Sequence, residues 1–163
     1  MNGLRIGYGT DIHVLEENRD FVLGGIKIPH EKGFKAHSDG DVLIHAIIDA
    51  MLGALALGDI GSHFPDTSDE YKNIDSTVLL EKVNDMVSEK GYKIINIDST
   101  VHAEAPKLRP HIDNMRKNLS EILGIDIEQI SIKAKTGEGV DAVGQKQAVK
   151  AECVVLLNNT FSD

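Results

Sequence analysis

The sequence predicts an α/β fold of the α+β sandwich type, with a small mixed β-sheet, helices packed on one face of it, and an N-terminal β-hairpin. Three observations predict it. Strand-like and helical segments follow one another in the order ββ-α-α-β-α-β-β. One helical segment is apolar almost all round, which is typical of a helix buried against a sheet. The chain has 163 residues, 41% of them hydrophobic and 26% charged, so it fits a single domain over residues 1–163 with its own core.

The first strands and the apolar helix lie in the first third of the chain. Residues 4–12 have the pattern of a strand, and residues 21–28 that of its hairpin partner, with glycines at a turn or bulge. The run 38–41 supplies a capping side chain and acidic residues for a helix that continues to about Leu57. Two glycines and a proline then interrupt the chain in the polar segment 58–66, which we interpret as a functional loop and candidate lid rather than an ordinary connection.

The rest of the chain is predicted to contain two helices and three strands. Asp75 or Ser76 caps a helix that runs to about Lys90. Residues 92–105 alternate like a strand, and a helix with Pro110 in its first turn ends at Gly124. The last two strands are the segments 130–135 and 148–157.

The composition indicates which partners to expect. The formal net charge of −9 disfavours nucleic acid and anionic membranes, which are usually bound through clustered Lys and Arg. No apolar stretch is long enough to span a bilayer and the N-terminus lacks the apolar core of a secretory signal, so we expect a cytoplasmic protein without a membrane partner. Cys153, the only cysteine, lies in an apolar run, which predicts a buried, inert thiol. Small molecules are the better candidate ligands. If the substrate is anionic, the acidic chain must supply local positive charge, and a metal ion can do so.

Asp11, His13 and His45 are the candidate metal ligands. Residues two apart on a strand project from one face about 7 Å apart, so Asp11 and His13 could reach one cation, with His45 as a third ligand. One oxygen and two nitrogens suit Zn²⁺ and leave a fourth position open, which is the catalytic pattern. The alternatives are a chance D-x-H pair and a hydrogen-bonded core histidine. Asp49, four residues after His45, could orient the imidazole or simply satisfy it as a core hydrogen bond.

Two loops could also carry chemistry. Glu138 lies between glycines just after a strand, where backbone amides could meet a phosphate and the carboxylate a second cation such as Mg²⁺, although an ordinary solvated turn has the same pattern. The proline-bounded loop 103–110 has two cations, Lys107 and Arg109, and could hold a nucleobase or phosphate, or be a surface turn. An anion near His37 and the helix start after it could meet free amides. The other histidines have no obvious partner and are interpreted as surface or structural residues: His30, His63, His102 and His111.

Four ordered motifs resemble the 2-C-methyl-D-erythritol 2,4-cyclodiphosphate synthase family, over about residues 4–158. They are the segments GYGTDIH (7–13), AHSDGDVLIHA (36–46), ALGDIGSHFPD (56–66) and APKLRPH (105–111). The resemblance implies an enzyme of non-mevalonate isoprenoid biosynthesis that cyclises 4-diphosphocytidyl-2-C-methyl-D-erythritol 2-phosphate and releases CMP. The 2-phosphate would attack the β-phosphorus of the same molecule, by alignment and charge neutralisation rather than a covalent enzyme intermediate.

The resemblance also implies roles for individual residues. Asp11, His13 and His45 match the zinc ligands, Glu138 matches the ligand of a second divalent cation (Mg²⁺ or Mn²⁺), and His37 and Thr136 match catalytic residues that position the phosphates. The residues implied to contact substrate are Asp11, His13, His37, Ser38, Asp59, Ile60, Gly61, Phe64, Pro65, Asp66, Ala103, Ala105, Pro106, Lys107, Leu108, Arg109, Lys135, Thr136, Gly137 and Glu138.

Similar proteins are homotrimers with active sites between subunits, so the Lys107 loop of one protomer would serve the metal site of another. One segment departs from the family pattern: Ala142 and Gln145 stand where many members have an aromatic residue and an arginine. Any contact made by those two side chains elsewhere is not carried over. Two other functions stay open, a zinc hydrolase that activates water and gives a linear product, and a metal- or phosphate-binding module without turnover.

Overall fold

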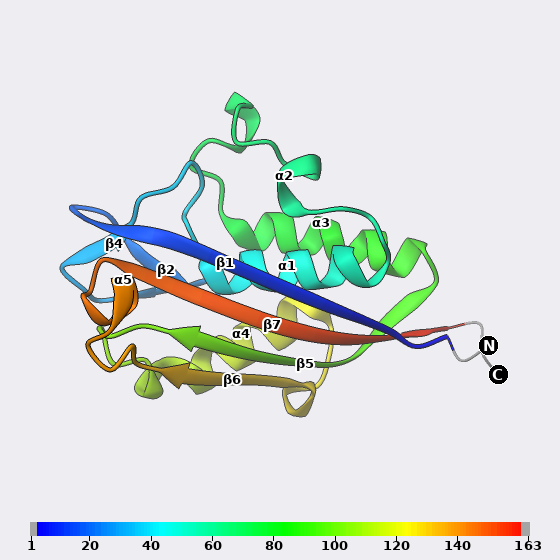
Figure 1. Ribbon diagram of the computed structural model, residues 1–163. Coiled ribbons are helices and arrows are strands. Elements are labelled where there is room, and N and C mark those ends of the chain that lie inside the picture. The colour runs from blue at the N-terminus through cyan, green and yellow to red at the C-terminus, as the bar shows by residue number, and fades with distance from the viewer. Residues whose placement is uncertain (1–2, 161–163) are drawn as a thin grey trace.

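The computed structural model describes residues 3–160 and contains a five-stranded sheet and a separate two-stranded sheet (Figure 1). The strands are β1 (Arg5–Glu17), β2 (Phe21–Leu23), β3 (Ile26–Ile28), β4 (Lys32–Phe34), β5 (Tyr92–His102), β6 (Ile130–Lys135) and β7 (Ala148–Asn159). The helices are α1 (Val42–Ala54), α2 (Ile60–His63), α3 (Ser76–Glu89), α4 (Ile112–Leu123) and α5 (Asp141–Gly144), with 3-10 turns at Asp69–Tyr71, Arg109–His111 and Ile127–Gln129.

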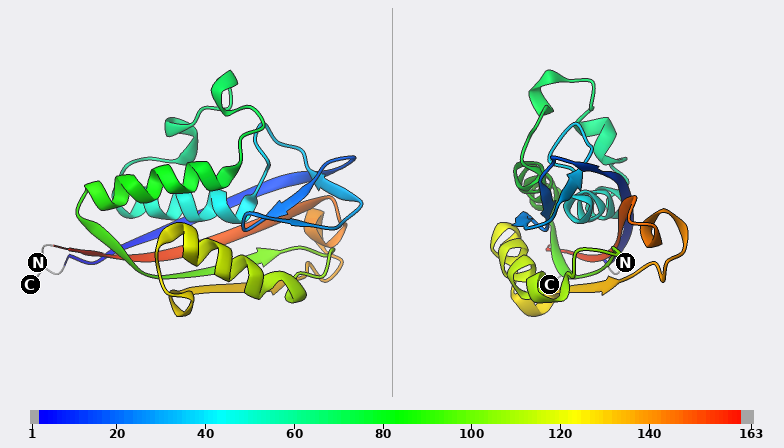
Figure 2. Two further views of the ribbon diagram at one scale, coloured as in Figure 1. Left: turned by 180° about the vertical axis from the view of Figure 1, so that it is seen from behind. Right: turned by 90° about the vertical axis from the view of Figure 1, so that its left-hand side faces the viewer.

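The large sheet is mixed, and its strand order is β4-β1-β7-β5-β6. Only the β5–β6 pair is parallel, whereas β1 runs antiparallel to β4 and β7, and β5 antiparallel to β7. The views from behind and from the end show α1, α3 and α4 on one face of this sheet (Figure 2). This arrangement confirms the predicted fold class.

The pairing predicted for the first strand is wrong, although the predicted turn is right. Residues 21–28 form β2 and β3, which pair with each other around Gly24 and Gly25, while β1 pairs with β4 and β7. The turn is held by Asp41, whose carboxylate accepts from the Gly24 and Gly25 N–H groups at 3.0 and 2.7 Å. The buried carboxylate therefore draws the hairpin toward the start of α1 instead of along β1.

The remaining differences concern short elements and ends. The helix predicted to reach about Leu57 ends at Ala54, because the chain folds back and Leu57 N–H donates to the Leu52 carbonyl. The strand predicted over 92–105 ends at His102. Elements of three or four residues were not predicted, namely β4 in the segment 30–37, α2 within 58–66, and α5. The starts of α1 and α3 after Asp41 and Asp75, and the end of α4 at Gly124, are confirmed.

Other expectations about the chain can be compared with the structure. Cys153 is buried, and burial raises the pKa of its thiol to about 12, which confirms an inert thiol. Within residues 3–160, none of the helices has the length and apolar character needed to cross a membrane.

Helix α1 packs directly on strand β1, and glycine makes this approach possible. A side chain at Gly9 would overlap the carbonyl oxygen of Ala46, and one at Gly7 the carbonyl oxygen of Ala50. Both glycines are buried beneath the helix, whose residues are almost all buried. Without a Cβ at these two positions, backbone can meet backbone, and strand and helix lie closer than ordinary side chains would allow.

Replacing Gly9 with alanine should destabilise the fold by about 3 kcal/mol, because the added methyl group would force the backbone of α1 to move. Gly53→Ala is the matched control on α1, where a Cβ meets only the Tyr8 carbonyl oxygen at 3.9 Å. That control should be neutral or stabilising by up to about 1 kcal/mol. Urea denaturation measures both variants, and equal stability of the two would contradict the close packing.

Candidate metal centre and substrate pocket

Three side chains from two elements converge at the carboxyl half of β1. Asp11 Oδ2 lies 3.0 Å from His13 Nε2 and 2.9 Å from Nδ1 of His45, which projects from α1. The two histidine nitrogens lie 3.4 Å apart. One ligand atom from each residue lies within 4.8 Å of the others, with Asp11 and His13 partly exposed and His45 buried. This donor set fits a divalent metal ion that keeps one position open toward solvent.

The carboxylate and imidazoles change one another's ionisation. Burial would raise the pKa of Asp11, but its hydrogen bonds to His13 and His45 outweigh burial and lower it to about 2. Burial would likewise lower the pKa of His45, but the hydrogen bond and charge of Asp11 raise it above its ordinary value. Asp11 is therefore ionised at neutral pH, and the raised pKa of His45 means that a proton competes with a metal ion for this imidazole.

Asp49 neither orients the His45 imidazole nor satisfies it as a core hydrogen bond. Its carboxylate instead accepts a hydrogen bond from the Ile60 N–H at 2.7 Å, and burial raises its pKa. Both earlier interpretations of Asp49 are therefore wrong. The residue ties the segment 58–66 to α1, so the buried helix positions both His45 and the loop after it.

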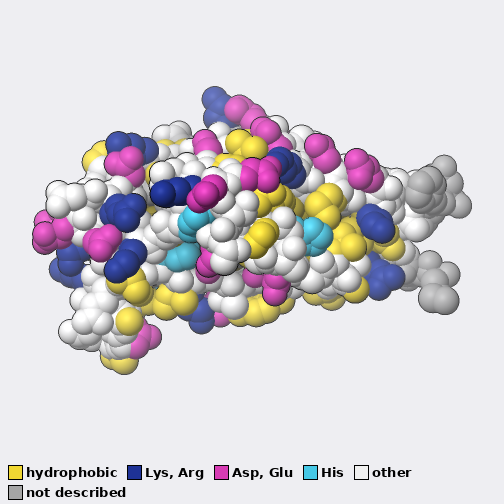
Figure 3. All heavy atoms as spheres, turned by 90° about the horizontal axis from the view of Figure 1, so that it is seen from above, with side chains coloured by type: hydrophobic (Ala, Val, Ile, Leu, Met, Phe, Trp, Pro, Cys, Tyr) yellow, Lys and Arg dark blue, Asp and Glu magenta, His cyan; other side chains and the backbone are white. Residues whose placement is uncertain are grey.

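The segment 58–66 is ordered by its own hydrogen bonds. Asp59 caps α2 by accepting from the Ser62 N–H at 2.9 Å, and His63 Nε2 donates to the Leu57 carbonyl at 2.7 Å. Ile60 and Phe64 pack against the core, while Gly61, Pro65 and Asp66 are exposed. Figure 3 shows the face on which this segment lies, with histidine side chains at the surface and acidic and basic side chains around them. A role for the segment as a lid stays a prediction.

His37 and Ser38 lie just before α1 and border the same region. His37 Nε2 donates to the Ser68 carbonyl at 3.0 Å, and the His37 carbonyl accepts from the Asn73 N–H at 2.8 Å. These bonds hold the loop before α3 against the start of α1. Ser38 Oγ lies 3.4 Å from His45 Nε2. The structure thus brings Ser38 to the metal centre, while the catalytic role of His37 stays a prediction.

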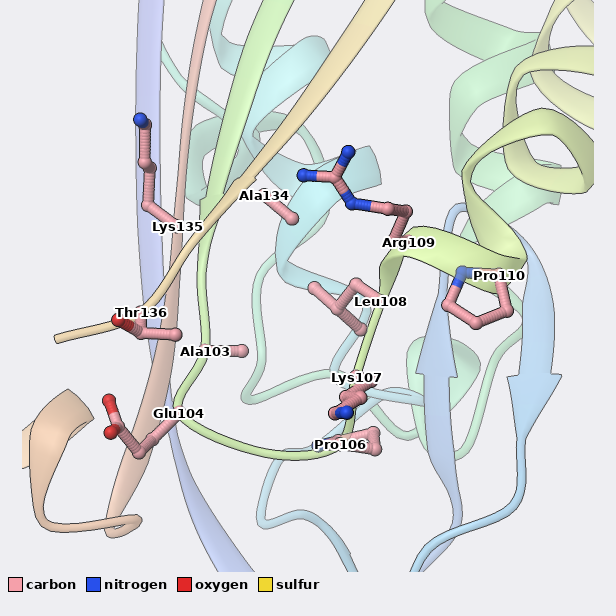
Figure 4. A pocket seen from close by; sticks show the side chains of 10 residues that line it. All are labelled: Ala103, Glu104, Pro106, Lys107, Leu108, Arg109, Pro110, Ala134, Lys135 and Thr136. Carbon is pink, nitrogen blue, oxygen red and sulfur yellow. The ribbon is translucent and has the colours of Figure 1, made fainter. Parts of the chain in front are cut away.

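A cavity of about 500 Å³ lies at the other edge of the sheet, beside β6 (Figure 4). Its volume suits a small organic ligand. Its lining comes from the loop after β5 and the end of β6, as residues Ala103, Glu104, Pro106, Lys107, Leu108, Arg109, Pro110, Ala134, Lys135 and Thr136. Lys107 and Arg109 are exposed and give positive charge to this rim of an acidic chain.

Glu104 lies within the predicted loop 103–110, but its contact was not predicted. Its carboxylate accepts from the Gly137 N–H at 2.8 Å and so joins the loop after β5 to the loop after β6. The contact arises from the parallel pairing of those strands, which no local pattern around Glu104 reveals. It also means that the Gly137 amide already has a carboxylate partner.

The loop after β6 holds Glu138 outside the metal centre. Glu138 has a left-handed backbone (φ 52°) and is exposed, and Thr136 Oγ1 donates to its carboxylate at 3.3 Å. Gln145, where many members of the family have arginine, donates from Nε2 to the Gly139 carbonyl at 2.6 Å. Gln145 therefore braces this loop, and Ala142 nearby is exposed.

The metal centre and the cavity lie along the same row of paired residues across the sheet, but beside different strands. Asp11 pairs with Ala151, Ala151 with Val101, and Val101 with Ala134 beside the cavity. Three strand spacings separate the two, which is about 14 Å. One chain thus contributes a metal-binding group and a ligand pocket at separate places.

Three donors that could hold one metal ion, on an α/β scaffold that also carries a ligand-sized cavity, fit the class of metal-dependent enzymes rather than that of structural metal proteins. The comparisons with known proteins refine this class. The chain belongs to the YgbB family, whose model matches residues 4–158.

Two relatives match this chain over nearly their whole length. The 2-C-methyl-D-erythritol 2,4-cyclodiphosphate synthase of Clostridioides difficile (strain 630) is 55% identical, covering 94% of this chain and 96% of that protein. The synthase of the same name from Brachyspira hyodysenteriae (strain ATCC 49526 / WA1) is 57% identical, with 96% and 99% covered.

Solved structures have the same fold. A 2C-methyl-D-erythritol-2,4-cyclodiphosphate synthase with bound CDP matches with a TM-score of 0.88 and 40% identity, covering 94% of this chain and all of that one. The bifunctional IspDF of Campylobacter jejuni matches with a TM-score of 0.94 and 41% identity, covering 98% of this chain, and the chain spans only 43% of its length.

Metal affinity should depend on pH, because a proton and the metal ion compete for His45. The pKa of His45 lies above 6.5, so below that pH its imidazole is protonated in the metal-free chain and must lose a proton on binding. Because one proton is released on binding, the apparent association constant should fall by up to about tenfold for each pH unit below 6.5. Competition with a chromophoric chelator measures it, and an affinity that stays constant below pH 6.5 would contradict this electrostatic account.

Proposed function

We propose that the chain converts 4-diphosphocytidyl-2-C-methyl-D-erythritol 2-phosphate into 2-C-methyl-D-erythritol 2,4-cyclodiphosphate and CMP, in non-mevalonate isoprenoid precursor biosynthesis in the cytoplasm. The observation that carries the proposal is the Asp11, His13 and His45 group, in a chain 55% and 57% identical to relatives named as that synthase. A bond forms between a 2-phosphate oxygen and the β-phosphorus, and the bond from that phosphorus to CMP breaks. The atoms balance without water or a covalent enzyme intermediate.

Zinc is the metal that we assign to the three donors. Asp11 Oδ2, His13 Nε2 and His45 Nδ1 would hold it, since one oxygen and two nitrogens suit this ion. Bound zinc supplies Lewis-acid polarisation of a phosphate oxygen and a template for the reacting groups. The low pKa of Asp11, about 2, keeps the carboxylate anionic at neutral pH and offsets part of the metal charge.

The other residues bind and align the substrate. The 58–66 segment, through Asp59 and Gly61, would hold the methylerythritol unit, while His37 and Thr136 would position the phosphates. Glu138 would hold a second cation, Mg²⁺ or Mn²⁺, at the diphosphate. The cavity beside Lys107 would take cytosine and ribose, in keeping with the CDP bound in similar structures. Catalysis then rests on alignment and on neutralising crowded negative charge.

We further propose a homotrimer with active sites between subunits. The separation of the metal centre from the cavity by about 14 Å within one chain supports it. So does an exposed apolar row on the sheet face opposite α1, where Ile6 is 73% exposed and Tyr8, Ile12 and Val14 are each more than half exposed. Such a row on a sheet face is typical of an interface. Another copy could cover it and bring its own cavity to this metal centre.

The reaction is tested by phosphorus NMR of the zinc- and magnesium-loaded protein with its proposed substrate. Signals of CMP and a cyclic diphosphate are expected. His45→Ala should lose zinc and turnover with the fold largely intact, because it removes one of the three ligands, whereas His30→Ala, outside the metal centre, should retain both.

The other outcomes separate the alternatives. CMP with a linear product that carries solvent oxygen would indicate a hydrolase. Unchanged substrate despite stoichiometric zinc would indicate a binding module. Either result would refute the proposed reaction, and full turnover by His45→Ala with stoichiometric zinc would refute the ligand assignment.

A further inference from the structure

The imidazole of His45 has partners on both nitrogens. Nδ1 faces Asp11 in the metal centre, whereas Nε2 lies 2.8 Å from Ser76 Oγ on the first residue of α3. Ser76 Oγ in turn lies 2.5 Å from Asp39 Oδ1. Ser76 is fully buried and His45 nearly so. A row of three hydrogen-bonded groups therefore leads from the metal centre into the protein.

The direction of the protons in this row follows from the groups themselves. An ionised carboxylate only accepts, so the single hydroxyl proton of Ser76 goes to Asp39. The Ser76 oxygen can then only accept from the imidazole, and His45 Nε2 must carry a proton. In the neutral ring this leaves the lone pair on Nδ1, the nitrogen that faces Asp11 and His13.

Asp39 is itself held firmly. Its Oδ2 accepts from the Ser76 N–H at 2.9 Å, its Oδ1 accepts from the Asp41 N–H at 3.1 Å, and its own N–H donates to the Ile74 carbonyl at 3.2 Å. Ser38 Oγ also approaches His45 Nε2, but at 3.4 Å it is a much weaker partner than Ser76. The carboxylate is thus fixed between the starts of α1 and α3.

We propose that Ser76 and Asp39 are positioning residues of the metal centre, which hold the His45 ring in the tautomer and orientation that present Nδ1 to the metal ion. This inference rests on the metal site of the proposed function. It assigns a role to two residues that the motifs indicated only as helix starts. Partners of this kind hold a metal-ligating imidazole in place and raise its basicity as a ligand.

The test is a Co²⁺ titration of the whole chain, followed by the visible absorption of the bound ion and by thermal unfolding. Ser76→Ala removes the acceptor of the Nε2 proton and should weaken Co²⁺ binding by about 10–100-fold and alter the absorption band. Asp39→Asn is a second variant of nearly the same size. It should also weaken Co²⁺ binding and alter the band, because both oxygens of Asp39 accept from Ser76, whereas an amide offers one acceptor and sets an N–H group against the other Ser76 donor.

Asp75→Ala is the matched control at the same helix start. Asp75 is exposed and caps α3 by accepting from the Thr77 N–H at 2.9 Å, without contacting His45. Its loss should lower the unfolding temperature, as a purely structural effect does, but leave Co²⁺ affinity within about twofold and the absorption band unchanged.

Two failures are distinguishable. If the unchanged chain binds Co²⁺ and both Ser76→Ala and Asp39→Asn bind it equally tightly with the same band, the positioning role is overturned while the metal site stands. If Asp75→Ala weakens binding as much as Ser76→Ala does, helix loosening explains the effect and the inference is also overturned. If the unchanged chain binds no Co²⁺, the metal site of the proposed function fails, and this inference fails with it.

Discussion

The direct packing of α1 on β1 is the constraint on which the rest of the structure depends. Gly7 and Gly9 let the two backbones meet, because a side chain at either position would overlap a carbonyl oxygen of the helix. The strand carries Asp11 and His13, and the helix carries His45. The ligand atoms of one metal centre thus come within hydrogen-bond distance of one another only if this approach is kept, so a packing requirement of the core also sets the geometry of the site.

The polar groups around the same helix connect the site to its surroundings. Asp41 at the N-terminal end accepts from the N–H groups of Gly24, Gly25 and Ile44, and burial together with the charge of Asp39 raises its pKa to about 6. Asp49, one turn beyond His45, holds the Ile60 amide. Each of these two carboxylates secures a segment outside the helix. Asp41 holds the β2–β3 hairpin, and Asp49 holds the segment 58–66.

Short sequence patterns predicted those features that depend on residues close together in the chain. The start of α1 after Asp41 and the three metal donors followed from residue types and spacing, since a cap and a strand periodicity act within a few residues. The partner of β1, the contact of Glu104 with Gly137 and the bond of Asp49 to Ile60 did not. Each of these joins segments that the topology brings together. For β1 and Asp49 a partner closer in sequence was predicted instead, and no partner was predicted for Glu104. The short β4 and α2 were missed because three or four residues carry too little periodicity.

We propose that Asp11 Oδ2, His13 Nε2 and His45 Nδ1 form a single catalytic zinc site completed by a neighbouring copy of the chain. A crystal structure of the zinc- and CDP-loaded protein, with the metal located by anomalous scattering at the zinc edge, tests this claim most directly. The predicted result is one zinc per chain on those three atoms, with CDP in the cavity beside Lys107 of the adjacent protomer. Zinc bound by other ligands would contradict it. So would a site in which a single chain binds both the CDP and the zinc.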